Sequence, residues 1–165
     1  MSQQKDVNEK MRAILVDWLI EVHLKFKLLP ETLFLTVNLI DRYLSKEQVS
    51  RGRLQLVGVT AMLIACKYEE IYPPEIRDFI YITDKAYQRS DILAMEYSML
   101  RVLDFEITTP SPYVFLERYR KLMGSDSKTF NLARYVLELT LIDLKMVKHK
   151  PSLLAGGALY LANRI

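Results

Sequence analysis

The sequence predicts an all-α protein. Its 165 residues include only five glycines, well below the usual share of about 7%. Few positions therefore suit strand-linking tight turns or loops that hold phosphates. Apolar residues recur at helical spacing along nearly the whole chain, and the interruptions fall at prolines, glycines and short polar clusters.

Eight helices can be drawn from these patterns. Their approximate ranges are 7–28, 30–44, 53–70, 75–82, 90–102, 113–123, 127–144 and 151 onward. The first follows a polar N-terminal stretch. Pro30 suits the first turn of the second helix, where Glu31 also meets the positive end of the helix dipole. Pro73 and Pro74 end the third helix. A proline disfavours the helical conformation of the residue before it, and it cannot donate the backbone hydrogen bond that the interior of a helix requires.

The later elements are delimited in the same way. Thr83–Asp84 opens the turn after the short fourth helix, and Ser90–Asp91 lies near the start of the fifth. Residues 105–112 are the least helical stretch and predict a linker. Beyond it, Gly124–Ser125 stops the sixth helix, and Pro151 suits the start of the eighth.

A weak internal repeat connects the two halves of the chain. The run Leu-Ile-Asp at 39–41 recurs at 141–143, and the alanine-flanked run 61–65 resembles 158–162. Alanines four residues apart lie on one helix face and allow a neighbouring helix to approach closely. The repeat indicates two copies of one helical unit. Because the apolar pattern runs to Ile165 without a polar cap, we expect the second copy to be incomplete.

Composition excludes several classes of protein. One cysteine, Cys66, forms no internal disulfide, and with only His23 and His149 it builds no Cys/His zinc cluster, which favours a reducing compartment. The apolar runs are short and the N-terminus is polar, so we expect no membrane span and no secretory signal. The net charge of +3 is spread along the sequence, which argues against a nucleic-acid-binding stripe.

No catalytic pattern is present in the sequence. Cys66 lies in an apolar helical run typical of a buried thiol, and Gly156–Gly157 lacks the surrounding phosphate-loop pattern. Glu69 and Glu70 are adjacent, so on a helix their carboxylates diverge and do not readily share a metal. We therefore expect no enzyme activity, no cofactor and no metal site, and a function carried by surfaces.

The first helix is apolar on two sides. One face carries four residues at i, i+3, i+4 and i+7: Met11, Ile14, Leu15 and Trp18. The opposite face carries Ala13, Val16 and Ile20. Such a helix is either the buried centre of its domain or buried on one side and adhesive on the other. Glu21 lies close in angle to the Trp18 face and favours a wetter edge.

The run MRAILVDWL at 11–19 resembles the signature of the cyclins. In the family's order it is followed by LIDRYL, LQLVGVTAMLIACKYEEIYPPEI and FIYITD, then by Met95-Glu96 and the Leu103-Asp104-Phe105 stretch. The resemblance covers nearly the whole chain. KYEEIYPPEI, LVGVTAM and ELTLID are most similar to the A and B group, and KFKLL at 25–29 is typical of the mitotic B type.

The resemblance implies a fold of two five-helix cyclin boxes. Residues 1–107 would form the first box with its preceding helix, 108–112 the linker, and 113–165 the front part of a second box. It also implies a non-enzymatic regulatory subunit that binds and activates a cyclin-dependent serine/threonine kinase. Such a subunit controls cell-cycle progression around G2/M and acts in the nucleus and the cytoplasm, without binding nucleic acid or membranes.

The family's interaction residues carry over to matching positions. Lys67 and Glu96 would contact the backbone around the kinase's regulatory helix as donor and acceptor. Their implied apolar neighbours are Tyr68, Leu100, Phe105 and Ile107. Arg12 and Asp41 match a buried structural ion pair, in which loss of one partner leaves an unpaired buried charge.

The apolar face of the first helix matches a docking patch for substrates and inhibitors with a basic-x-leucine motif. The resemblance implies that Met11, Ile14, Leu15 and Trp18 form one wall and that Arg51, Leu54 and Gln55 form the other. Glu21 would accept the cation of the peptide. The rival interpretation is a cyclin-fold transcription adaptor that binds DNA or the transcription machinery, for which we would expect a basic face.

Overall fold

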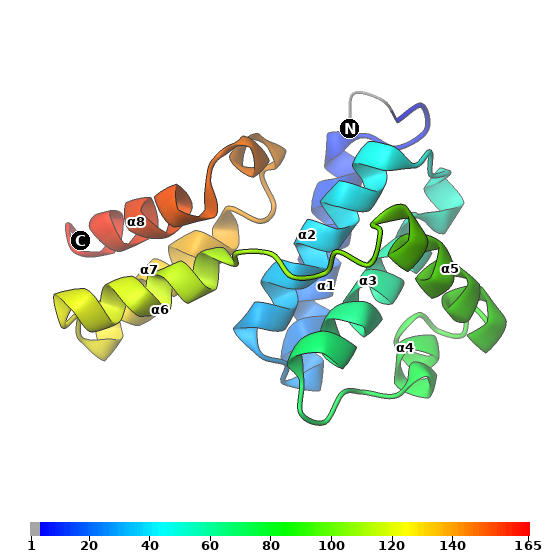
Figure 1. Ribbon diagram of the computed structural model, residues 1–165, viewed down its shortest axis with the longest axis horizontal. Helices are drawn as coiled ribbons and strands as arrows, with labels where there is room; N and C mark the ends of the chain where they lie inside the picture. Colours follow the sequence, from blue (N-terminus) through cyan, green and yellow to red (C-terminus); the bar gives the residue numbers. More distant parts are fainter. Residues whose placement is uncertain (1–3) are drawn as a thin grey trace. The chain divides into compact units, whose positions relative to one another are not determined.

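The computed structural model describes residues 4–165. Over these residues it contains eight α-helices, two short 3-10 helices and no strand (Figure 1). The predicted all-α class is therefore confirmed. The chain divides into two compact units, Met1–Thr108 and Thr109–Ile165.

The first unit is built around a buried central helix. Its α-helices over the described residues are α1 (Glu9–Phe26), α2 (Pro30–Lys46), α3 (Leu54–Glu69), α4 (Ile76–Ile82) and α5 (Arg89–Val102), and the 3-10 turn η1 (Arg51–Arg53) leads into α3. The other four helices all contact α3 (Figure 1). From Leu54 to Cys66 every residue of α3 except Gln55 is buried, as expected of a helix that is apolar on all sides.

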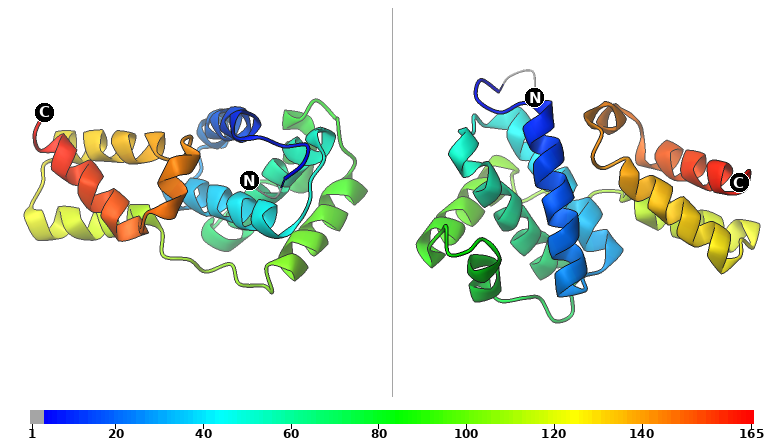
Figure 2. Two further views of the ribbon diagram at one scale, coloured as in Figure 1. Left: turned by 90° about the horizontal axis from the view of Figure 1, so that it is seen from above. Right: turned by 180° about the vertical axis from the view of Figure 1, so that it is seen from behind.

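α1 lies along the outside of this unit (Figure 2, right). It buries one side, with Leu15, Val16 and Leu19 in the core, whereas the side chain of Ile14 is 61% exposed. Of the two alternatives left by the sequence, α1 is therefore the helix that is buried on one side and apolar on the other.

α1 approaches α3 closely at Gly58. A Cβ atom added there would lie 2.7 Å from Leu15 Cδ1. Because that separation is below van der Waals contact, any larger residue would push the Leu15 side chain or α1 itself away from α3. Gly58 thus lets the Leu15 side chain pack directly against the backbone of α3.

The ends of α1 are fixed by local hydrogen bonds, which make it shorter than the predicted 7–28. Asn8 Oδ1 accepts the Met11 N–H at 3.0 Å and caps the helix at its start. At the other end Lys27 adopts the left-handed conformation, with φ 54°, and the Leu28 N–H donates to the His23 carbonyl.

Glu70 joins the end of α3 to the start of α2. Its Oε1 accepts the Leu29 N–H at 2.8 Å and the Thr32 hydroxyl. Leu29 is the residue that precedes α2, and its own side chain makes no capping bond. Glu70 therefore caps α2 from a distance of 41 residues in sequence.

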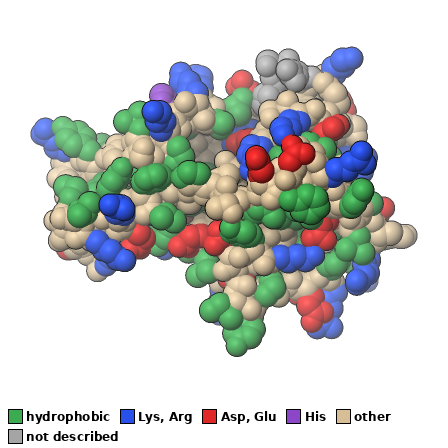
Figure 3. Space-filling view, viewed as in Figure 1, with side chains coloured by type: hydrophobic (Ala, Val, Ile, Leu, Met, Phe, Trp, Pro, Cys, Tyr) green, Lys and Arg blue, Asp and Glu red, His purple; other side chains and the backbone are tan. Residues whose placement is uncertain are grey.

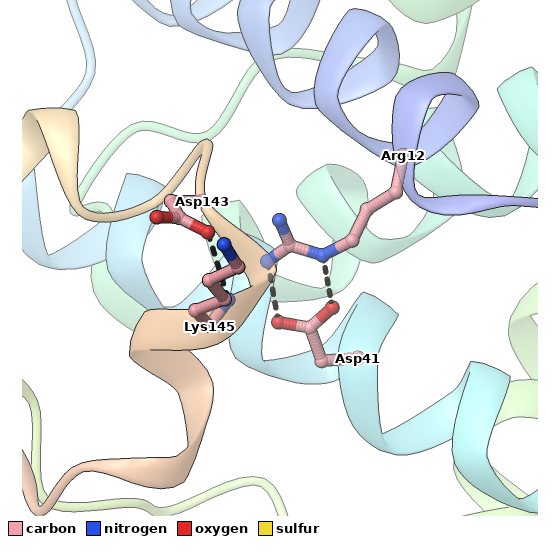
Figure 4. Close-up of polar contacts among 4 residues, drawn as sticks. All are labelled: Arg12, Asp41, Asp143 and Lys145. Carbon is pink, nitrogen blue, oxygen red and sulfur yellow. Dashed lines mark hydrogen bonds and ion pairs between the residues drawn. The ribbon is translucent and has the colours of Figure 1, made fainter. Parts of the chain in front are cut away.

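The second unit, which is described throughout, contains α6 (Pro112–Met123), α7 (Ser127–Leu139), the 3-10 helix η2 (Leu144–Lys148) and α8 (Pro151–Ala162). Its three α-helices contact one another (Figure 2, left). The predicted extension of α7 to 144 is wrong, because the Thr140 hydroxyl donates to the Leu137 carbonyl and the chain turns there. Asp143 then accepts the Lys145 N–H at 2.9 Å and starts η2 (Figure 4).

The second unit leaves several apolar side chains exposed, and Figure 3 shows hydrophobic side chains on its front face. Leu122 on α6 and Leu153 and Tyr160 on α8 are all more than half exposed. The buried side of α8 consists of Ala155, Ala158, Leu159 and Ala162.

None of the described helices combines the length and the apolarity needed to cross a bilayer.

We predict that Cys66 is chemically inert in the folded protein. Burial, and to a smaller degree the Glu70 carboxylate, raise the pKa of its thiol from the ordinary value of 9.0 to about 12. The thiol should therefore resist alkylation at neutral pH until urea unfolds the chain. The folded chain binds the thiol proton more tightly than the unfolded chain does. The contribution of the buried thiol to the stability of the fold is therefore lost as the pH rises from 9.0 towards 12. Rapid labelling of native protein would contradict this prediction.

Candidate functional site

Two candidate surfaces lie at the two ends of α3. Leu54 and Gln55 belong to its first turn, and Lys67 and Tyr68 to its last. At 1.5 Å per residue, the thirteen-residue step from Leu54 to Lys67 spans roughly 20 Å. The two surfaces are therefore separate sites on one rigid element.

At the C-terminal end of α3, Lys67 pairs with Glu96 on α5. Lys67 Nζ lies 2.6 Å from Glu96 Oε1, and the two side chains are 47% and 13% exposed. A pair this accessible contributes little to stability, about 1 kcal/mol at most. Its value is positional, since it holds one donor and one acceptor side by side at the surface.

The apolar candidates continue this surface. Phe105 is 66% exposed, and its N–H donates to the Leu100 carbonyl at 2.9 Å. The Ile107 N–H in turn donates to the Phe105 carbonyl. Asp104 and Phe105 both have positive φ, of 53° and 57°, a conformation that costs roughly 1–2 kcal/mol per residue away from glycine. The turn thus leaves Phe105 exposed, just beyond the end of α5, on which Glu96 lies.

Three further residues near the end of α3 were not selected from the sequence: Thr108, Ile71 and Tyr72. The Tyr68 hydroxyl lies 2.5 Å from Thr108 Oγ1, which ties α3 to the segment after α5. Ile71 and Tyr72 follow α3 directly and are 84% and 92% exposed. The sequence did carry a signal for Ile71 and Tyr72. Two apolar residues directly before a pair of prolines lie outside a helix, and such residues can remain exposed as a binding surface.

The second surface is a hollow between α1 and the start of α3. It has a volume of about 280 Å³ and is lined by Met11, Ile14, Leu15, Trp18, Arg51, Leu54 and Gln55. All seven were expected to form the docking patch. The volume is just below the range of about 300–1,000 Å³ typical of sites for small molecules, and the lining suits one or two apolar side chains of a peptide.

Glu21 does not line this hollow. It is exposed on α1 beyond Trp18. Arg51 and Gln55 instead supply the polar groups of the lining. The hollow therefore has apolar walls with a cation and an amide on the α3 side, and a carboxylate outside it.

The Arg12–Asp41 pair joins α1 to α2. Arg12 Nε lies 2.6 Å from Asp41 Oδ1, and Arg12 Nη2 lies 2.7 Å from Asp41 Oδ2, so the contact is bidentate (Figure 4). Arg12 is fully buried, and the Asp41 side chain is 15% exposed. Arg12 therefore acts on the position of α1 and is not available to an external ligand.

The described residues include no candidate metal centre, at these surfaces or elsewhere. Within residues 4–165, no cluster of three His, Cys, Asp or Glu side chains is arranged to hold a metal ion. His23 is buried, with Nε2 3.0 Å from the Leu29 carbonyl oxygen.

Family models match both units of the chain. "Cyclin, N-terminal domain" covers residues 1–108, and "Cyclin, C-terminal domain" covers residues 110–165. The chain belongs to the cyclin family.

The curated relatives include B-type and mitotic cyclins. The chain is 55% identical over 162 residues to Cyclin-B2-1 of Oryza sativa subsp. japonica, and 54% identical over 162 residues to the G2/mitotic-specific cyclin-2 of Medicago sativa. These alignments include 98% of this chain but only 39% and 49% of the two relatives. The chain thus spans about two-fifths to one-half of their length, and the predicted similarity to B-type cyclins is confirmed.

Solved structures share the fold. A viral cyclin from herpesvirus saimiri superposes with a TM-score of 0.89 at 22% identity, over 98% of this chain and 72% of that one. A chain of the yeast RNA Pol II CTD kinase CTDK-1 complex superposes with a TM-score of 0.84 at 15% identity, over 99% of this chain and 58% of that one. At these identities the likeness establishes the fold alone.

We predict that breaking the Arg12–Asp41 pair destabilises the first unit. Arg12→Ala should lower the free energy of unfolding by about 3–5 kcal/mol, because it leaves a carboxylate without its bidentate partner. Urea denaturation followed by circular dichroism measures this change. Arg53→Ala, which removes an exposed arginine from η1, is the control; equal losses from the two substitutions would contradict a structural role specific to Arg12.

Proposed function

We propose that this chain is the kinase-binding and substrate-docking part of a B-type cyclin. It acts as a regulatory subunit that activates a cyclin-dependent serine/threonine kinase around G2/M, in the nucleus and the cytoplasm, and performs no chemistry itself. The observation that carries the proposal is that the Lys67–Glu96 pair lies beside Tyr68, whose hydroxyl contacts Thr108 at the end of the segment that carries Phe105. The mitotic names of the relatives and the fold shared with a chain of a kinase complex support it.

The kinase-binding surface combines polar and apolar groups. Lys67 offers N–H donors and Glu96 carboxylate oxygens, which are what the unsatisfied backbone groups at helix ends require. Phe105 and its partly buried neighbour Ile107 supply apolar area around them. In such an interface a few desolvated anchors contribute most of the binding free energy. Docking there would position the kinase's regulatory helix and complete the catalytic arrangement in the kinase.

The hollow would recruit substrates independently of the kinase surface. An apolar side chain of a basic-x-leucine motif would occupy the space between Trp18 and Leu54, and Glu21 would attract the cation of the motif from outside the hollow. Because the two surfaces are roughly 20 Å apart along α3, one chain can bind the kinase and a substrate together.

We predict that exchanging the charges of the Lys67–Glu96 pair strongly weakens kinase binding without unfolding the protein. Lys67→Glu with Glu96→Lys keeps an ion pair but reverses donor and acceptor, so the affinity for a purified cyclin-dependent kinase should fall by about tenfold or more. Replacing both residues with alanine should have the same effect. A pull-down measures binding, and circular dichroism checks the fold.

The control is the same exchange at another helix-surface pair, Arg134→Glu with Glu138→Arg, whose native atoms lie 2.8 Å apart. It should leave kinase binding unchanged. Unchanged kinase binding by the Lys67–Glu96 exchange would overturn the proposal. Retention of duplex DNA at physiological salt, without kinase, would favour the DNA-binding adaptor.

We predict that Trp18→Ala impairs the phosphorylation of docking-motif substrates only. Removing the indole from the hollow should raise the KM for such substrates by about tenfold, while short peptides without the motif are phosphorylated normally. Ile20→Ala, which truncates a half-buried residue on the opposite face of α1, is the matched control. Equal loss with both kinds of substrate would mean that Trp18 is only a core residue.

A further inference from the structure

The segment before α1 is attached to a distant part of the first unit by its polar side chains. Residues 4–8 precede α1 and form no helix, yet three of their side chains make specific hydrogen bonds to backbone groups. These side chains are Gln4, Asp6 and Asn8. Between them Val7 is buried in the core, with 4% of its surface exposed. The segment is therefore anchored by both polar and apolar contacts.

Gln4 binds the region where α2 ends. Its Nε2 donates to the Leu44 carbonyl at 2.8 Å and also to the Glu47 carbonyl. Its Oε1 accepts the Val49 N–H at 3.0 Å. One carboxamide thus uses donor and acceptor together and fixes the course of the chain from α2 towards η1.

Asp6 contacts the backbone of Arg51, two residues after Val49. Its Oδ2 accepts the Arg51 N–H at 2.7 Å, a short charge-assisted bond. Arg51 is the first residue of η1, and Ser50 before it makes no side-chain capping bond. Asp6 supplies that missing acceptor from 45 residues away in sequence.

The hydrogen bonds of Asp6 and Asn8 are made to the first residue of each wall of the hollow. Arg51 begins the wall that continues through Leu54 and Gln55. Asn8 caps α1 by accepting the N–H of Met11, the first residue of the other wall. A single stretch of five residues therefore fixes where each wall begins.

We propose that Gln4 and Asp6 are positioning residues of the docking patch, which hold the Arg51 wall at its distance from α1. This inference rests on the docking function proposed above. Since Asp6 and Arg51 are exposed and their bond lies at the surface, its loss should leave the core intact. Loss of this bond would instead loosen the Arg51 wall, which a bound peptide would contact.

Trp18 provides a direct measurement. It is the only tryptophan of the chain and lines the hollow, so its fluorescence reports on a bound peptide. The probe is a synthetic peptide with an arginine two positions before a leucine. We expect Asp6→Ala to raise the dissociation constant about three- to tenfold, the range that corresponds to the net contribution of one exposed hydrogen bond. Gln4→Ala should act in the same direction.

Two variants separate positioning from charge. Asp6→Asn keeps an oxygen that can accept the Arg51 N–H and should restore most of the affinity. Glu9→Ala removes an exposed carboxylate of equal charge from the first turn of α1 and should leave the affinity unchanged. Kinase pull-down should be normal for all four variants, because Lys67 lies roughly 20 Å along α3 from the wall. Equal losses in Asp6→Ala, Asp6→Asn and Glu9→Ala would overturn the proposal.

Amide hydrogen exchange tests the attachment without any peptide. The Arg51 N–H should exchange faster in Asp6→Ala than in the unaltered chain or Asp6→Asn, because only the alanine variant lacks an acceptor. Unchanged exchange at Arg51 would overturn the positioning role even if the unaltered chain binds the peptide. Conversely, failure of the unaltered chain to bind the peptide overturns the docking function, and with it the role of these residues in docking.

Discussion

The packing of the first unit follows from the burial of α3. A helix that is apolar on every side has to be covered on every side, so α1, α2, α4 and α5 all contact it. The covering is close: at Gly58 no room is left for a Cβ beside Leu15. The Arg12–Asp41 pair then fixes α1 against α2. The position of every candidate site follows from this packing.

Because its middle is buried, α3 meets solvent only towards its ends, and these are where the candidate surfaces lie. Its first turn contributes Leu54 and Gln55 to the hollow, and its last turn presents Lys67 and Tyr68. A rigid helix keeps such sites at a constant separation. The arrangement suits a subunit whose proposed task is to bind a kinase and a substrate at once, and it needs no catalytic group.

Sequence motifs located most of the candidate site. Lys67 and every residue of the hollow except Arg51 lie in long runs that resemble the cyclins, and Glu96 lies in a shorter match. Three of the missed residues, Thr108, Glu70 and Asp6, share one property: their partners are distant in sequence. Thr108 meets Tyr68, Glu70 caps α2 at Leu29, and Asp6 accepts the Arg51 N–H. The acceptors and donors in the last two cases include backbone groups, which leave no pattern in the amino-acid sequence.

The all-α class, the approximate helices and the family could be predicted from the sequence, because apolar periodicity, glycine content and long motifs are local properties of the chain. The sequence left open whether α1 is a buried centre or has an exposed apolar side, and it predicted an α7 that is too long. The tertiary structure resolves these points, because they depend on which surfaces other helices cover. It also decided that Arg51 and Trp18 face one hollow while Glu21 remains outside it, since that depends on the packing of α1 against α3 and on the anchored segment before α1.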